Sequence, residues 1–393
     1  MEKSNSIINI SFNQDNSCFS LATETGFKIY QTYPFKGPYE RKMKGGIGNV
    51  QMLYKSNFLA MLGGGKAPIY NNNKVVIWDE NKTKVISELK FITKIINIKL
   101  KKDLLFVICE ERIYIFNLNT YDIIDTIDTG KNLKGLIAIN ADPSFNIIAY
   151  PSIKGLDNIT IRNFKIKRNK CINIALEEII NFMTINYDGT LLAISNEGGT
   201  LIKIYSCIDG SYLKQYKRGH DRVENIYLCF DNENKFLAIS SSKGTIHIFS
   251  LSSTLLKLKK IEKKNEKLID SNKIKDKVRL EQNEEKEKEK EKNNEKIELF
   301  KLEEDIEEDD LKNKEEKNIN IINNKKELKI PENTKSIFGN EICFAKFKIK
   351  PQRNICTFIR SNILIIITFN NKYYQVEIDM KKGYTKLLLE KNI

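Results

Sequence analysis

A doublet of cations, Lys217 and Arg218, stands in the run Tyr216-Lys217-Arg218-Gly219 between two segments of nearly the same pattern. Residues 192–203 and residues 237–247 both carry small apolar residues, serine, a Gly-Thr step and a basic residue. Hydroxyls and cations both donate hydrogen bonds to phosphate, and ionised donors form the stronger bonds. Successive side chains of an extended strand point to opposite faces, so each cation can serve a different pocket. The run therefore predicts a phosphate-binding site.

The segments around this run belong to a longer repeat. The order strand, Asp or Gly turn, strand, Gly turn, strand occurs at residues 8–30, 183–205 and 227–249, and the last two copies start 44 residues apart. A period of ~40–45 residues is typical of WD40-like propeller blades. The sequence predicts an all-β, seven-bladed WD40-like β-propeller, with blades that start near residues 6, 47, 90, 133, 178, 222 and 352.

One segment breaks the repeat. Residues 253–336 are rich in Lys, Glu and Asn, and a segment with so few aromatic residues cannot bury enough apolar surface to fold alone. We predict a single propeller domain formed by residues 1–252 and 337–393. Residues 253–336 are predicted to be a disordered, low-complexity insertion loop within the sixth blade, which a strand at residues 342–347 then completes.

The charge is concentrated outside the insertion. The chain has a net charge of +14, whereas residues 253–336 contain 23 basic and 23 acidic residues. A basic body favours an anionic partner, either a membrane surface or a nucleic acid, and a general bias toward Lys and Asn is the alternative explanation. No helix-turn-helix, zinc module, P-loop or nucleophile motif is present, which disfavours nucleic-acid binding and catalysis. With seven scattered cysteines and two histidines, we expect no metal and no cofactor.

Several short motifs carry a more specific resemblance. They are Thr25–Tyr30 with Pro34-Phe35, Gly45–Gly48, Gly63–Gly65 with Pro68, Lys74–Asp79, Asn132–Leu136 and Tyr150-Pro151. Together with residues 216–219, these motifs resemble the PROPPIN family, the WIPI-type β-propellers that bind phosphoinositides. In that family the run at 216–219 reads Phe-Arg-Arg-Gly. The resemblance covers nearly the whole chain outside the insertion.

The resemblance implies two rim sites for phosphatidylinositol 3-phosphate or the 3,5-bisphosphate, in blades five and six. Site 2 would use Arg218, Gly219, Ser241, Thr245 and His247; site 1 would use Lys217, Thr200, Lys203 and Ser195. In site 1 the family usually has arginine at both lysine positions, a serine where Ile194 stands and, in some members, a histidine where Leu176 stands. Lysine keeps the charge but loses the planar fork that matches phosphate. We therefore expect site 1 to be the weaker site.

The resemblance also implies a membrane-inserting loop between the third and fourth strands of blade six. Its candidate residues are Leu255, Leu256, Leu258 and Ile261, which stand among lysines; a plain surface loop is the alternative. No apolar run reaches the ~18–20 residues of a membrane span.

The function that the resemblance implies is that of a non-enzymatic, monomeric, cytoplasmic effector. It would associate peripherally with endosomal, vacuolar or preautophagosomal membranes and recruit autophagy lipid-transfer and conjugation proteins. The alternative function is a WD40-type protein-interaction scaffold that has lost lipid binding.

Overall fold

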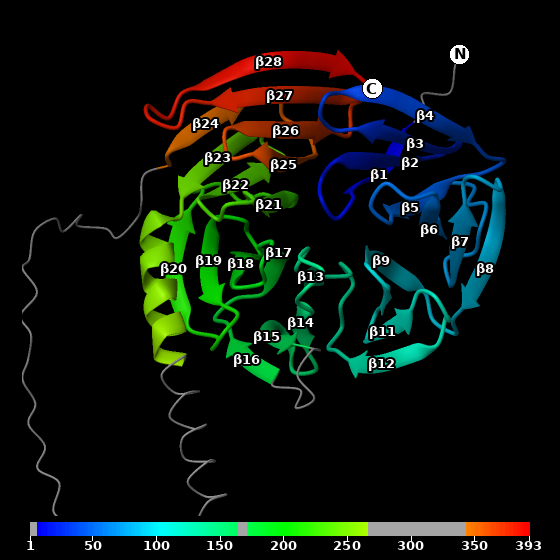
Figure 1. The fold of residues 1–393 in the computed structure, drawn as a ribbon, viewed down its shortest axis with the longest axis horizontal. Helices are drawn as coiled ribbons and strands as arrows, with labels where there is room; N and C mark the ends of the chain where they lie inside the picture. Colours follow the sequence, from blue (N-terminus) through cyan, green and yellow to red (C-terminus); the bar gives the residue numbers. More distant parts are fainter. Residues whose placement is uncertain (1–5, 164–170, 266–342) are drawn as a thin grey trace, which may run out of the picture. The chain divides into compact units, whose positions relative to one another are not determined.

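Seven four-stranded antiparallel sheets contain every strand of the described residues, which are 6–163, 171–265 and 343–393 of this computed structural model. Each sheet consists of four strands consecutive in the sequence, and the sheets form a ring (Figure 1). We call them blades one to seven in chain order. The prediction of an all-β, seven-bladed propeller is confirmed. The chain divides into two compact units, residues 1–259 with 340–393 and residues 260–339, and the propeller belongs to the first.

The strand bounds of the first four blades are as follows. Blade one contains β1 (Ile7–Phe12), β2 (Cys18–Thr23), β3 (Gly26–Gln31) and β4 (Lys36–Lys42), and blade two contains β5 (Ile47–Met52), β6 (Phe58–Gly63), β7 (Lys74–Asp79) and β8 (Lys84–Lys90). Blade three contains β9 (Ile95–Lys101), β10 (Leu104–Cys109), β11 (Arg112–Asn117) and β12 (Ile123–Asp128), and blade four contains β13 (Ala138–Ile139), β14 (Ile147–Ser152), β15 (Gly155–Asn163) and β16 (Cys171–Ala175).

Three further blades complete the ring. Blade five contains β17 (Ile180–Ile185), β18 (Leu191–Asn196), β19 (Leu201–Ser206) and β20 (Tyr212–Lys217), and blade six contains β21 (Ile226–Phe230), β22 (Phe236–Ser241), β23 (Thr245–Ser250) and β24 (Ala345–Lys348). Blade seven contains β25 (Asn354–Arg360), β26 (Ile363–Thr368), β27 (Lys372–Ile378) and β28 (Thr385–Asn392).

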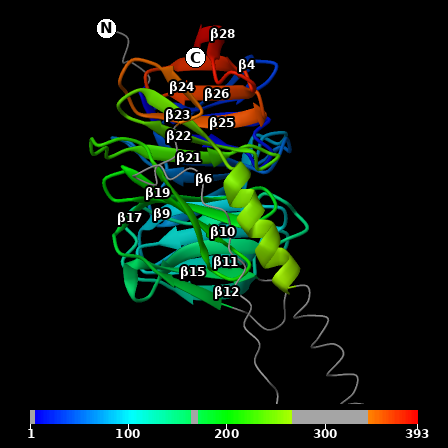
Figure 2. The same ribbon diagram turned by 90° about the vertical axis from the view of Figure 1, so that its left-hand side faces the viewer.

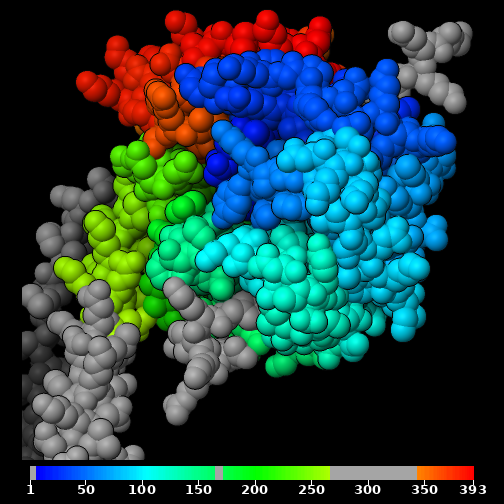
Figure 3. All heavy atoms as spheres, turned by 45° about the vertical axis from the view of Figure 1, so that its right-hand side comes forward, coloured from blue at the N-terminus to red at the C-terminus, as the bar shows by residue number. Residues whose placement is uncertain are grey.

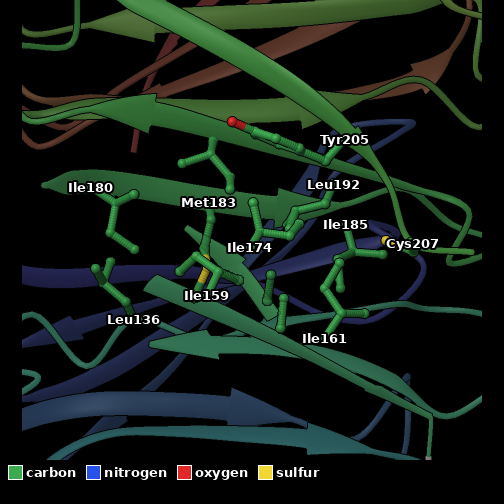
Figure 4. Packing of buried hydrophobic residues seen from close by; sticks show 13 residues of the cluster. Leu136, Ile159, Ile161, Ile174, Ile180, Met183, Ile185, Leu192, Tyr205 and Cys207 are labelled. Carbon is green, nitrogen blue, oxygen red and sulfur yellow. The ribbon is translucent and has the colours of Figure 1, made fainter. Parts of the chain in front are cut away.

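Strand burial follows the position of each strand in its blade. All six residues of β2 and of β26 are buried, because each strand has a neighbour on either side and a blade against each face. The outermost strand β8 instead alternates exposed and half-buried residues. Figure 4 shows how the facing sheets of blades four and five pack together through apolar side chains such as Ile159 and Met183. Burial of this apolar surface on both faces of each blade is the main source of stability.

Blade seven closes the ring against blade one, and Figure 3 shows the two as adjacent red and blue surfaces. The ring of Tyr373 stacks on Phe19 with centroids 6.3 Å apart, and its hydroxyl donates a hydrogen bond to Thr32 O at 2.9 Å. No strand of one blade pairs with the other blade in the described residues. Side-chain packing therefore holds the closure.

The insertion begins with a helix at residues 252–265, where the sequence predicted the start of a disordered loop (Figure 2). Thr254 and Leu258, four residues apart and therefore on one helix face, are both buried. Lys257 Nζ donates a hydrogen bond to Leu213 O at 2.6 Å, which holds the helix against β20. Tertiary contacts of this kind stabilise a helix that the local composition alone would not.

The rest of the predicted insertion falls largely outside the described residues. Residues 266–336 of the predicted loop are not among them, nor is residue 342 of the predicted closing strand. The strand that completes blade six is β24, which begins at Ala345. None of the helices that the described residues form is long and apolar enough to cross a membrane.

Candidate functional site

The strand β20 ends in the cation doublet, and its pairing places the two cations on opposite faces of blade five. Lys217 pairs with Leu201 on β19, and the backbone N–H of Arg218 donates to Thr200 O at 2.8 Å. Cross-strand partners share a face and successive residues alternate. Lys217 therefore lies on the face of Leu201, whereas Arg218 lies on the face of Tyr216, toward blade six.

Arg218 is buried, with only 7% of its surface exposed. Its Nε donates a hydrogen bond to Gly199 O at 2.6 Å, and Nη2 donates to Asp221 O. Burial lowers the pKa of the guanidinium, an effect that the carboxylate of Asp221 opposes. The remaining guanidinium N–H groups have no acceptor among the residues that the structure describes. They are donors that an anionic ligand can use.

The facing surface of blade six carries the other predicted residues of site 2. His247 pairs with Ile239, so Ser241 and Thr245, two residues away along β22 and β23, lie on the same face. His247 stacks on Phe249 with ring centroids 6.3 Å apart. Gly219 follows Arg218, and a side chain there would meet no atom within 4 Å. The structure thus brings Arg218, Ser241, Thr245 and His247 together, and we call their common surface the blade-six face.

His247 is neutral at pH 7 in this setting. Its pKa is lowered to about 4, mainly by burial and to a smaller extent by the positive charges of Lys346 and Arg218. A bound phosphate would reverse this effect, because a nearby negative charge favours the protonated imidazole. His247 can therefore become a cationic hydrogen-bond donor when an anion arrives.

Ser241 presents an unsatisfied hydroxyl on the blade-six face. It is 1% exposed, and its Oγ has no hydrogen-bond partner among the described residues. Its backbone is fixed, since Asn354 Nδ2 donates to Ser241 O at 2.9 Å. Leaving a buried hydroxyl unpaired costs about 1–3 kcal/mol. A ligand oxygen that accepts from this hydroxyl would recover that cost.

Two residues of the blade-six face were not identified from the sequence. Lys346 and Lys348 on β24 pair with His247 and Thr245, so both lysines share the face of the site residues. The signal was the alternation of lysine with apolar residues from Ala345 to Lys348, which is typical of a strand with one solvent-facing side.

The opposite face of blade five, which we call the blade-five face, carries the cations predicted for site 1. Lys203 Nζ forms an ion pair with Glu177 Oε2 at 2.9 Å, and the hydrogen bond to Glu177 raises the pKa of Lys203. Glu178 accepts a hydrogen bond from Asn196 Nδ2 at 2.8 Å. A cavity of about 20 Å³ lies here, lined by Leu176, Glu177, Glu178, Ile180, Ile194, Asn196, Leu201 and Lys203. The two glutamates, which the sequence reasoning did not consider, partly neutralise this face.

Ser195 does not lie on the same face as the cations predicted for site 1. Ser195 pairs with Phe182 and Ile202, on the face opposite to that of Lys203. It is fully buried, and its Oγ accepts a hydrogen bond from Phe182 N at 3.1 Å. Thr200 is half-buried, and its Oγ1 accepts a hydrogen bond from Asn196 Nδ2 at 3.2 Å. The structure therefore does not bring the four predicted residues of site 1 onto one face.

The candidates for membrane insertion also differ from the expectation. Leu258 is only 4% exposed and packs in the propeller unit, so in this conformation it cannot enter a bilayer. Leu256 is 65% exposed. Leu255 and Ile261 are half-buried. The reason is the helical spacing described above, which turns Leu258 toward the protein.

A cavity with a volume of about 1350 Å³ forms the channel along the propeller axis. Its lining consists mainly of residues from the innermost strands and includes none of the residues predicted for either site. The candidate sites are therefore separate from the channel.

Comparisons with known proteins agree with the fold. SVP1-like protein 2 of Saccharomyces cerevisiae is 33% identical over 282 residues, which cover 63% of this chain and 63% of that protein. Autophagy-related protein 18 of Kluyveromyces lactis is 27% identical, over 69% of this chain and 66% of its own. These alignments span less than two thirds of each relative's length.

Solved structures support the same architecture. The crystal structure of Hsv2 from Kluyveromyces marxianus superposes with a TM-score of 0.68 at 18% identity and covers 99% of both chains. A structure described as a complex of KlAtg21 with the coiled coil of AgAtg16 has a TM-score of 0.66 at 17% identity. At this identity the likeness establishes the fold.

The family model decides the assignment. The model described as PROPPIN matches residues 6–260, which include the first five blades, the signature run and the first three strands of blade six. This match covers well over half of the chain. The chain belongs to the PROPPIN family.

Proposed function

We propose that this protein is a peripheral membrane effector that binds phosphatidylinositol 3-phosphate or the 3,5-bisphosphate through the blade-six face. Arg218 supplies the permanent charge, Ser241 and Thr245 supply hydroxyl donors, and His247 gains a proton when phosphate binds. Such charge-assisted hydrogen bonds are about twice as strong as neutral ones.

The observation that carries this proposal is the unpartnered hydroxyl of Ser241, which lies on the same side of blade six as His247, the residue on which the buried guanidinium of Arg218 acts. Buried polar groups in folded proteins nearly always have a partner. A hydroxyl and a guanidinium that both retain unused donors define a surface prepared for an anion.

Site 1 remains a prediction and is given a minor role in this proposal. Lys217 and Lys203 can attract an anionic surface, but the ion pair with Glu177 offsets the charge of Lys203. Two engaged sites would raise avidity well above the affinity of either one. With one strong site, membrane residence depends instead on the blade-six face and on the general attraction of lysines to anionic lipids.

The proposed cellular role is recruitment of autophagy proteins to membranes that carry these lipids. The relatives named autophagy-related protein 18, and the structure described as a complex with the coiled coil of AgAtg16, support this role.

Ser241→Ala tests the proposal with little risk to folding, because the hydroxyl that it removes has no partner in the described protein. The matched control is Ser240→Ala. Ser240 Oγ is also buried and unpartnered among the described residues, but Ser240 points to the other face of β22.

Both variants and the wild-type chain are compared by co-sedimentation with vesicles at ~150 mM salt, where weak surface attraction is screened. The vesicles contain phosphatidylinositol 3-phosphate, the 3,5-bisphosphate, the 4-phosphate or phosphatidylserine. We expect selective binding to the 3-phosphorylated lipids, about 3- to 10-fold weaker in Ser241→Ala and unchanged in Ser240→Ala. Equal binding of the wild-type chain to all anionic vesicles, or to none, would contradict the proposal and favour the scaffold function.

A further inference from the structure

The strand β24 brings two lysines to the edge of the blade-six face. Lys346 stands opposite His247 and Lys348 stands opposite Thr245. Because cross-strand partners share a face, both ammonium groups lie on the side where Arg218 and Ser241 are found. Figure 1 shows β24 directly outside β23 in blade six.

Both lysines are exposed, and neither forms an ion pair with any residue that the structure describes. This distinguishes them from other cations of the region. Lys243 pairs with Asp221 at 3.0 Å, and Lys203 pairs with Glu177. The charge of Lys346 also acts on His247, which places its ammonium group within electrostatic reach of the site.

The charges of the site are insufficient for more than one phosphate without these lysines. Arg218 is a buried cation, and His247 is neutral before binding, so even with the proton that His247 gains on binding these two residues supply two positive charges. A phosphate monoester carries about −1.5 to −2 at pH 7, so two of them on one headgroup carry about −3 to −4. Neighbouring strands lie about 4.8 Å apart, which places Lys346 and Lys348 one strand spacing outside His247 and Thr245.

We propose that Lys346 and Lys348 bind the second phosphate of a doubly phosphorylated inositol headgroup while Arg218 and Ser241 hold the first. This inference rests on the proposed function and adds the residues that distinguish a bisphosphate from a monophosphate. It also assigns a ligand-binding role to β24, the strand that returns from the insertion.

The test uses the full chain and the variants Lys346→Gln and Lys348→Gln. Lys84→Gln is the matched control, since Lys84 is an exposed lysine on β8, the outermost strand of blade two. Lys346→Arg is included because it keeps the charge. Each protein is titrated with vesicles of phosphatidylcholine containing the 3-phosphate, the 3,5-bisphosphate or phosphatidylserine, and thermal unfolding checks the fold.

We expect each Lys→Gln variant to bind the bisphosphate vesicles about five-fold more weakly, which is the effect of one lysine near an anionic group. Binding to the monophosphate vesicles should change by less than about two-fold, and Lys346→Arg should bind like the wild-type chain.

An equal loss on all three vesicles, or no loss on the bisphosphate, would overturn the assignment of the two lysines. The proposed function would still stand if the wild-type chain selects 3-phosphorylated lipids. If the wild-type chain binds neither phosphoinositide, the proposed function fails, and the role of the lysines fails with it.

Discussion

The blade-five face and the blade-six face lie on opposite sides of the cation doublet, and their chemistry differs. On the blade-five face, Lys203 is paired with Glu177, and the adjoining cavity holds about 20 Å³. On the blade-six face, Arg218 has unused donors, and Ser241 Oγ has no partner in the described residues. The comparison shows that a cation in a signature is not by itself a site. Its neighbours determine whether the charge is available.

The largest loss of lipid binding should come from the removal of the Arg218 side chain. In Arg218→Ala, we expect binding to 3-phosphoinositide vesicles to fall about 10- to 100-fold, because hydrogen bonds from a charged donor contribute about 1.5–3 kcal/mol. Lys217→Ala, on the other face, should change binding less than about three-fold. Vesicle co-sedimentation measures both. Equal losses in the two variants would contradict the asymmetry between the faces.

Because removal of Arg218 also breaks its bonds to Gly199 and Asp221, Arg218→Lys serves as a second variant. It keeps the charge and loses the planar fork, so its affinity should lie between those of the wild type and the alanine variant.

The next prediction concerns the stability of the fold, which should depend on pH through the titration of His247. Its pKa in the folded protein is about 4, below the ordinary value of 6.5. Between these values the unfolded chain binds a proton that the folded chain does not, so the free energy of unfolding rises as pH rises from ~4 to ~6.5 and is then constant. The change is on the order of 3 kcal/mol.

Urea unfolding at a series of pH values measures this dependence. His247→Gln should lack the contribution, so acidification from pH ~6.5 to ~4 should lower the free energy of unfolding of the wild type more than that of the variant. Parallel curves for the two proteins would show that His247 titrates normally and that the blade-six face is more hydrated than the structure indicates.

A smaller loss of stability is expected when the hydroxyl of Tyr216 is removed. Its hydroxyl donates to Ser250 O at 2.9 Å and lies 3.0 Å from Thr254 Oγ1, at the start of the helix. Tyr216→Phe should lower the free energy of unfolding by about 1–2 kcal/mol and leave lipid binding unchanged. Tyr212→Phe, whose side chain is 53% exposed, is the control. Chemical denaturation measures both variants, and faster amide exchange at residues 252–259 would show that the helix has loosened.

The smallest change in lipid binding should come from a substitution that frees a cation on the blade-five face and so makes it more like the blade-six face. Glu177→Gln removes the partner of Lys203, so binding to anionic vesicles should rise by about two-fold. The pKa of Lys203, which the hydrogen bond to Glu177 raises, should fall toward its ordinary value. Unchanged binding would indicate that the blade-five face does not approach the membrane.

Much of the fold could be predicted from the sequence because it depends on local patterns. The alternation of side chains and the turn residues between strands set the blades. Ser241 and Thr245 are separated from His247 or its partner Ile239 by two residues along paired strands, so their common face could be predicted from the alternation of side chains. Helix formation at residues 252–265 could not be predicted from composition, because contacts of Thr254 and Leu258 with the propeller stabilise it.

The position of Ser195 on the other face has a specific physical cause. The face of a residue in a hairpin depends on the register that its turn imposes, and a shift of one residue reverses every side chain. The structure pairs Ile194 with Lys203, so Ser195 faces the other way. The ion pair of Lys203 with Glu177 could not be predicted from the strand pattern either, because Glu177 belongs to the connection between two blades.

The pairing of β23 with β24 differs from every other pairing in its separation along the chain. Ile248 pairs with Ala345, about a hundred positions later. In every other strand pair of the described residues, a short connection joins the two strands. The entropy of closing a loop grows slowly with its length, by about 0.6 kcal/mol for each doubling, so the finished blade tolerates the insertion. The cost falls on the folding rate, because distant contacts form slowly. We therefore expect the strand that carries Lys346 and Lys348 to join last, so that blade six stays open at its outer edge until the rest of the ring has folded.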